Sequence, residues 1–129
     1  MRRYLLDTHA FLWYLAESST LSQKARNVFQ LAEKGKAVIV LPAIVILECI
    51  DIMDKKKVAL QFEDVLLRIT QASNFMLAEM NWTLILETNK VKGLKDLHDR
   101  IIVATARIFN APILGKDKII TKLYPKTIW

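Results

Sequence analysis

Short apolar runs rich in β-branched residues alternate with longer amphipathic segments along the 129-residue chain. This alternation is typical of βα units built on a mostly parallel sheet. It predicts an α/β fold with four to five strands. We place the strands at about 3–7, 37–41, 74–78, 112–115 and 127–129, and the helices at about 9–16, 22–34, 43–53, 58–71, 82–90 and 94–110, with a short helix after Asp117.

Local signals support some of these boundaries. Ser22 is placed to cap the helix that follows it, and Asn110 marks the end of the longest helix. Pro42 suits the first turn of helix 43–53. That helix is apolar enough for us to expect it to be largely buried, although its letters "AIVIL" also suit a longer strand.

Composition favours one globular domain. Apolar residues make up 53% of the chain and charged residues 25%, and we find neither repeats nor a linker, so we predict a single domain over residues 1–129. The apolar stretch 37–47 is too short to span a bilayer. "MRRYLLD" runs directly into a predicted strand, which argues against a signal peptide. Cys49 is the single cysteine, so we expect a buried thiol and a reducing, cytoplasmic setting without a membrane partner.

The formal net charge is +6. An excess of lysines suits a polyanionic partner such as a nucleic acid. A solvated lysine face that keeps the protein soluble explains the same charge equally well.

Four acidic residues have apolar neighbours or follow a predicted strand: Asp7, Glu48, Asp99 and Asp117. Asp7 and Asp117 follow strands, and open α/β sheets bind ligands at the carboxyl ends of their parallel strands. A carboxylate in an apolar helix, such as Glu48, must protonate or acquire a partner. Asp99 lies at the positive end of the most apolar helix, which favours its ionised form.

If these four acids converge, a cation must neutralise them. All-oxygen ligation suits Mg²⁺ or Mn²⁺, and no cluster of histidines or cysteines offers a zinc site. One or two such ions can activate water and stabilise the charge on a phosphate, as the cutting of a phosphodiester requires.

Each acid also has a structural interpretation. Asp7 suits the cap of the helix that follows it, and Asp117 suits a cap or a turn. Asp99 fits the third position of a helix capped by Asp96. Glu48 has no basic residue within one turn, but a lysine or arginine of another helix would neutralise it. A structural role explains any one of these acids well. It explains less well why four of them occur in an alternating α/β order.

Two motifs resemble those of PIN-domain proteins, and most closely those of the VapC ribonuclease toxins of toxin-antitoxin pairs. "YLLDTHAFLWYL" is similar to the first-strand motif of the family, in which the acid is a metal ligand, here Asp7. "LHDRIIVATARIFNAPILGKD" is similar to the second signature, with acids at Asp99 and Asp117.

Glu48 matches a further acid of the family in position and surroundings, and the resemblance covers about residues 3–129. It implies a three-layer α/β/α fold and a Mg²⁺- or Mn²⁺-dependent endoribonuclease that cuts RNA. It also implies a homodimer inhibited by a cognate antitoxin. In this family the four acids would be catalytic metal ligands.

The chain departs from the family pattern at two positions. Many relatives carry a serine or threonine two residues before the last acid, where this chain has Gly115. The hydroxyl that would orient Asp117 or its water is therefore missing. Leu47 stands where many relatives have a tryptophan, which we interpret as a packing difference.

Three further residues are candidate RNA contacts. Thr8 is placed to bond a phosphate or a water, or equally to cap the first helix. Lys116 and Lys118 flank Asp117 and would hold RNA phosphates, although solvated lysines are the ordinary case.

We expect His9 to be structural, since the metal mechanism needs no histidine base. His98, at a helix start, is expected to point outward. We interpret Trp13 as a core or dimer-surface residue rather than a base-stacking platform.

Three functions compete. The favoured one is a metal-dependent endoribonuclease, either the toxin of a VapBC-type pair or a solitary RNA-processing nuclease. The second is a catalytically silent RNA-binding module of the same family. The third is a phosphoryl-transfer fold with an acidic pocket, against which "LLDTHA" argues because it lacks paired acids after the first strand.

Overall fold

The computed structural model describes residues 1–56, 60–72 and 74–129. In this part of the chain the strands pair in parallel and form one sheet in the order β3-β2-β1-β4-β5. This confirms the predicted sheet. The strands are β1 (Arg2–Leu6), β2 (Ala37–Pro42), β3 (Phe75–Ala78), β4 (Ile113–Leu114) and β5 (Thr127–Ile128).

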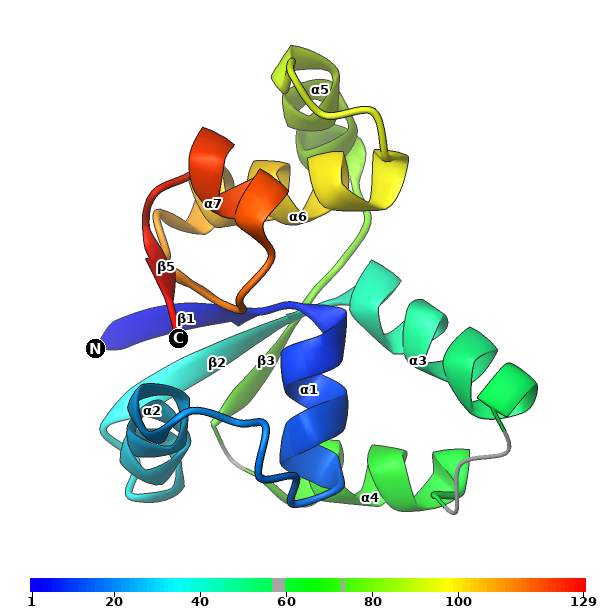
Figure 1. Cartoon of the computed structure of the whole chain (residues 1–129), viewed down its shortest axis with the longest axis vertical. Coiled ribbons are helices and arrows are strands. Elements are labelled where there is room, and N and C mark those ends of the chain that lie inside the picture. Colours follow the sequence, from blue (N-terminus) through cyan, green and yellow to red (C-terminus); the bar gives the residue numbers. More distant parts are fainter. Residues whose placement is uncertain (57–59, 73) are drawn as a thin grey trace.

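Helices cover both faces of the sheet, so the fold has three layers, α/β/α, as predicted (Figure 1). One layer holds α1 (Thr8–Leu15), α2 (Gln23–Glu33), α3 (Ala43–Lys56) and α4 (Phe62–Gln71). The opposite layer holds α5 (Trp82–Lys90), α6 (Leu97–Phe109) and α7 (Lys118–Leu123). Among the described residues, no helix has the length and hydropathy that crossing a bilayer requires.

β1 is the central strand of the sheet. The chain adds β2 and β3 on one side of β1 and then crosses over to add β4 and β5 on the other side. The register pairs Leu5 with Ile113 and Leu6 with Leu114. The carboxyl ends of β1 and β4 therefore lie side by side at a topological switch point, where open α/β sheets bind ligands.

The core lies between the central strands and the helices on each face. Leu5, Leu6, Ile39 and Leu41 are fully buried, because β1 and β2 are covered on both faces, which also explains why these strands are continuous apolar runs. The Cys49 thiol is buried, as expected, and burial raises its pKa to about 12.

Two predicted helix ends are confirmed in detail. The Ser22 hydroxyl accepts a hydrogen bond from the Ala25 backbone N–H at 3.1 Å and so caps α2. Asn110 ends α6 in the left-handed conformation, with φ 48° and ψ 47°. Both residues satisfy backbone groups that a helix terminus leaves without partners.

The helix predicted at 43–53 is a helix, but the expectation that it is largely buried was wrong. Only one face of α3 is buried, through Val45, Cys49 and Met53, because the helix lies at the side of the sheet and packs against α1. Leu47 is 59% exposed. Pro42 belongs to β2, not to the first turn of α3.

The helix predicted at 58–71 corresponds to α4, which begins at Phe62. The predicted start at residue 58 lies outside the described residues.

Candidate active site

A cavity of about 500 Å³ lies where β1 and β4 end. Five carboxyl groups from four segments line it: Asp7, Glu48, the pair Asp96 and Asp99 at the start of α6, and Asp117. The structure thus brings all four predicted acids to one cavity and adds Asp96, which we had interpreted only as a helix cap. Thr8, His9, His98 and Lys116 also line it.

Asp7 is the first residue after the central strand and the N-cap of α1. Its Oδ1 accepts a hydrogen bond from the Ala10 backbone N–H at 2.9 Å. The structural interpretation of Asp7 is therefore correct, but it does not exclude a role in the cavity, because Oδ2 is free of that bond. Burial, with a smaller contribution from the Asp117 charge, raises the pKa of Asp7 to about 6.

Asp99 and Asp117 likewise lie at helix N-termini. Asp96 caps α6 by accepting a hydrogen bond from the His98 backbone N–H at 2.8 Å, which places Asp99 in the first turn. Asp117 caps α7 and accepts hydrogen bonds from the N–H groups of Ile119 and Ile120, at 2.8 and 3.0 Å. Burial and the neighbouring charges of Asp96 and Asp117 raise the pKa of Asp99.

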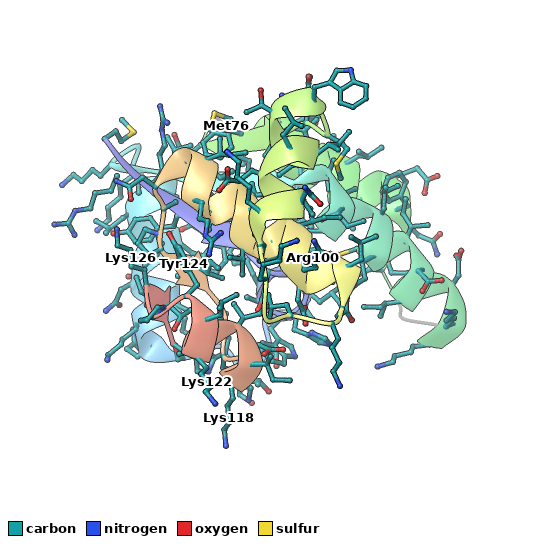
Figure 2. All side chains as sticks on the ribbon, turned by 90° about the horizontal axis from the view of Figure 1, so that it is seen from above. Met76, Arg100, Lys118, Lys122, Tyr124 and Lys126 are labelled. Atoms are coloured by element: carbon teal, nitrogen blue, oxygen red, sulfur yellow. The ribbon has the colours of Figure 1, made fainter. Side chains whose placement is uncertain are left out.

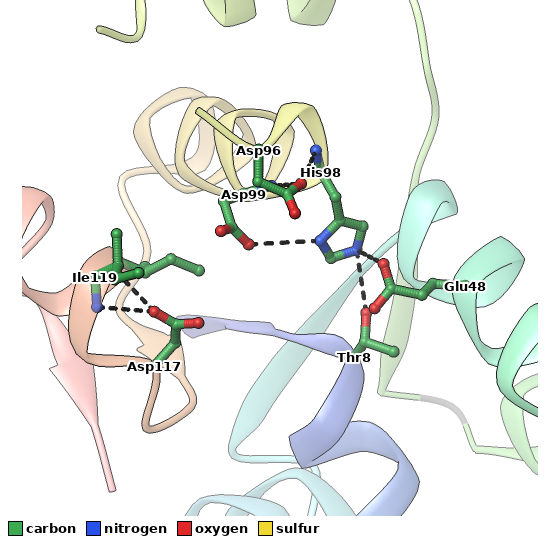
Figure 3. Close-up of polar contacts among 8 residues, drawn as sticks. Thr8, Glu48, Asp96, His98, Asp99, Asp117 and Ile119 are labelled. Carbon is green, nitrogen blue, oxygen red and sulfur yellow. Dashed lines mark hydrogen bonds and ion pairs between the residues drawn. The ribbon is translucent and has the colours of Figure 1, made fainter. Parts of the chain in front are cut away.

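His98 points into the cavity, so the prediction that it points outward was wrong. Its Nε2 lies 2.8 Å from Glu48 Oε2 and 3.2 Å from Thr8 Oγ1, and its Nδ1 lies 3.7 Å from Asp99 Oδ1 (Figure 3). The imidazole therefore joins α1, α3 and α6 across the cavity. It also supplies the partner that Glu48 needed, a histidine of another helix rather than a lysine or arginine.

The acids suit a divalent cation. Asp96, His98 and Asp99 form the one group in the described part of the chain whose candidate ligand atoms all lie within 4.8 Å of one another. Asp7 and Asp117 line the same cavity, and the charge of Asp117 raises the pKa of both Asp7 and Asp99. A cation between these carboxylates would remove that repulsion, and carboxylate oxygens are the ligands of hard ions.

The predicted RNA contacts differ in position. Thr8 is buried and bonded to His98, and the Lys116 side chain lies at the cavity with its Nζ 5.1 Å from the centre of the Trp13 ring. Lys118 does not line the cavity, and its side chain projects outward from α7 (Figure 2). Trp13 packs against the core, in line with its interpretation as a core residue, but it also lines the cavity, which that interpretation did not include.

Gly115 explains how Asp7 fits against β4. A Cβ atom at position 115 would lie 2.1 Å from Asp7 Oδ2 and 2.7 Å from its Cγ. The absent side chain thus leaves room for the Asp7 carboxylate, a consequence of the family departure at Gly115 that sequence alone did not reveal.

We expect Gly115→Ala to displace Asp7 and weaken its cap on Ala10. Loss of such a cap costs about 1 kcal/mol, measurable by urea unfolding. The control is the same substitution in an Asp7→Ala background, where no carboxylate is left to displace. An equal loss in both backgrounds would show that Gly115 acts independently of Asp7.

The fold and the cavity define an α/β protein with a candidate divalent-cation site at its switch point. Residues 4–125 match the PIN domain, and the chain belongs to the PIN-domain family. No curated protein matches the chain.

Several solved structures share the fold. A toxin-antitoxin complex from Klebsiella pneumoniae is 14% identical, with a TM-score of 0.70, and the match covers 98% of this chain and 96% of that one. VapBC2 from Rickettsia felis, bound to a promoter DNA fragment, is 18% identical with a TM-score of 0.67 and the same coverage. VapC20 from Mycobacterium tuberculosis, described as a sarcin-ricin loop cleaving toxin, is 11% identical with a TM-score of 0.68, covering 94% and 95%.

Proposed function

We propose that this PIN-domain protein is a Mg²⁺- or Mn²⁺-dependent endoribonuclease and the toxin of a VapBC-type toxin-antitoxin pair. The observation that carries the proposal is the convergence of Asp7, Glu48, Asp99 and Asp117 on one cavity at the switch point. The similarity in fold to VapC20, which is described as a sarcin-ricin loop cleaving toxin, supports it.

In this proposal Asp7, Asp99 and Asp117 would hold the cation, and Glu48 would be the fourth carboxylate beside it. A bound divalent ion would stabilise negative charge on the scissile phosphate and lower the pKa of the attacking water. His98 holds the Glu48 carboxylate through the 2.8 Å contact and thereby fixes its direction. Lys116 at the rim, together with the net charge of +6, attracts the RNA backbone.

We also propose a cognate antitoxin and a homodimer as the protein's partners. The similarity to solved toxin-antitoxin complexes supports the antitoxin. A small gene next to this one that encodes a protein with a DNA-binding N-terminus would support the antitoxin, and its absence would favour a solitary RNA-processing nuclease.

The test is RNA cleavage by the purified protein. We expect fragments from single-stranded RNA with added Mg²⁺ or Mn²⁺, loss of cleavage on chelation, and recovery when the ion is restored. Because water is the nucleophile, a substrate with a 2′-deoxyribose at the cut site is also cleaved. Cleavage that survives chelation, or that requires the 2′-hydroxyl, contradicts the mechanism, and no cleavage in any condition favours the silent RNA-binding module.

A further inference from the structure

One wall of the cavity is aromatic and cationic rather than acidic. We call His9, Trp13, Lys116 and Trp129 the aromatic wall; the first three line the cavity, and Trp129 joins them through its contacts with Trp13 and Lys116. The Trp13 and Trp129 ring centres lie 5.3 Å apart, and the His9 ring lies 5.7 Å from that of Trp13. The Lys116 Nζ lies 5.1 Å from the centre of the Trp13 ring and 6.0 Å from that of Trp129.

The wall is assembled at the switch point from three separate segments. His9 and Trp13 lie one turn apart on α1, Lys116 lies between β4 and α7, and Trp129 follows β5. His9, Trp13 and Lys116 line the same cavity as the acids. The wall therefore stands beside the carboxylates and not at a remote surface.

The Lys116 ammonium group is available to an anion. Although the cavity is acidic, no carboxylate of the described residues lies within 4.0 Å of its Nζ, which is held over the two tryptophan rings instead. Lys116 also lines the cavity, so its ammonium group is close to any anion that binds there.

Trp13 is exposed to the cavity over part of its surface. Its neighbour Phe11 is fully buried, whereas Trp13 is only half-buried and packs against the core with part of its ring. An indole at the edge of a wet cavity offers an apolar face on which a planar group can stack.

We propose that the aromatic wall is the subsite for an unpaired nucleotide next to the scissile phosphate, with its base stacked on the Trp13 and His9 side and its phosphate on Lys116. This proposal rests on the proposed nuclease function and adds to it the residues that would hold one unpaired nucleotide of the RNA. A base inside a duplex is already stacked on both sides and cannot reach the wall. Stacking of one base on an aromatic side chain is tolerant of sequence, so the wall selects unpaired structure more than base identity.

Binding is tested with tryptophan fluorescence. In an Asp99→Asn, Trp82→Phe protein, which is expected to be cleavage-inactive, the remaining emission comes from Trp13 and Trp129. We expect a single-stranded oligoribonucleotide to quench it in a saturable manner and a blunt duplex of the same length to leave it nearly unchanged. No quenching, or equal quenching by the duplex, overturns the proposal. Emission that changes with protein dilution in the absence of RNA also overturns it, because the wall would then be a protein interface.

Kinetics give the second readout. We expect Trp13→Leu to raise KM about tenfold, within the range that base stacking supplies, with kcat within about twofold of the original. Trp13→Phe, which keeps a stacking face, should restore most of the loss. Trp82 is 76% exposed on α5 and does not line the cavity, so Trp82→Leu is the matched control. A fall in kcat without a change in KM overturns the proposal.

A charge variant covers the case in which Trp13→Leu fails to fold. Lys116→Ala should raise KM several-fold more than Lys122→Ala, which removes the same charge from the exposed surface of α7 (Figure 2). Equal effects overturn the role of the wall. If Asp99→Asn abolishes cleavage while Trp13→Leu and Lys116→Ala leave KM unchanged, the nuclease function is supported and the subsite proposal is wrong. If no RNA is cleaved, the fluorescence experiment still decides the subsite.

Discussion

Asparagine in place of Asp7 or Asp99 is expected to lower the rate of RNA cleavage about a thousandfold. Each substitution removes one negative charge from the candidate cation site and leaves side-chain size nearly unchanged. A cation contributes several kcal/mol to transition-state stabilisation, and a loss of about 4 kcal/mol corresponds to a thousandfold. Asparagine is as good an N-cap as aspartate, so Asp7→Asn keeps the hydrogen bond to Ala10 and the effect is not one of folding.

The measurement is single-turnover cleavage of an end-labelled RNA at saturating Mg²⁺, with circular dichroism to verify the fold. Asp51→Asn is the matched control, because Asp51 lies three residues after Glu48 on α3 but is exposed and paired with Lys55 at 3.0 Å. The control should cleave at the original rate. If Asp7→Asn and Asp99→Asn both retain that rate, the assignment of the acids as cation ligands is wrong.

Without metal, Asp7→Asn is expected to stabilise the protein at neutral pH. The pKa of Asp7 is raised from 3.8 to about 6 by burial, so the native state holds its proton more tightly than the unfolded state. Stability from this group is therefore fully present below about pH 4 and falls as pH rises toward 6. By pH 7 the ionised carboxylate costs about 3 kcal/mol, which corresponds to about 10 °C in Tm for a domain of this size.

The measurement is urea unfolding from pH 4 to 7 in the presence of a chelator. The difference between the two proteins should be small at pH 4 and grow with pH. Added Mn²⁺ should make the original protein the more stable of the two. The ion binds the ionised Asp7 carboxylate of the native original protein, and the Asp7→Asn variant lacks this ligand. A difference that stays constant across this pH range would contradict the raised pKa.

The fold could be predicted because its signals are local. The spacing of apolar residues within a segment indicates a strand or a helix, whatever the segment packs against. Ser22 and Asn110 are residue types that commonly begin and end helices, so they indicate helix ends by themselves. The location of two acids at the cavity could be predicted for the same reason, since Asp7 and Asp117 follow strands directly; their role as cation ligands stays a prediction.

What could not be predicted depends on contacts between distant segments. His98 bonds Thr8 across 90 positions of sequence, and a helix start gives no indication of which neighbouring element its side chain meets. The space that Gly115 leaves for Asp7 and the placement of Trp13 on the cavity require the pairing of β1 with β4. The exposure of Leu47 likewise follows from where α3 packs, not from its composition.

The central position of β1 has a consequence for the chain as it leaves the ribosome. Synthesis delivers Asp7 before the strand that completes its surroundings, β4, and before the acid that follows β4, which both come more than a hundred residues later in the chain. A partly translated chain therefore cannot assemble the acidic cavity. Under the proposed function, a growing polypeptide would remain harmless to the ribosome that makes it until this segment has emerged.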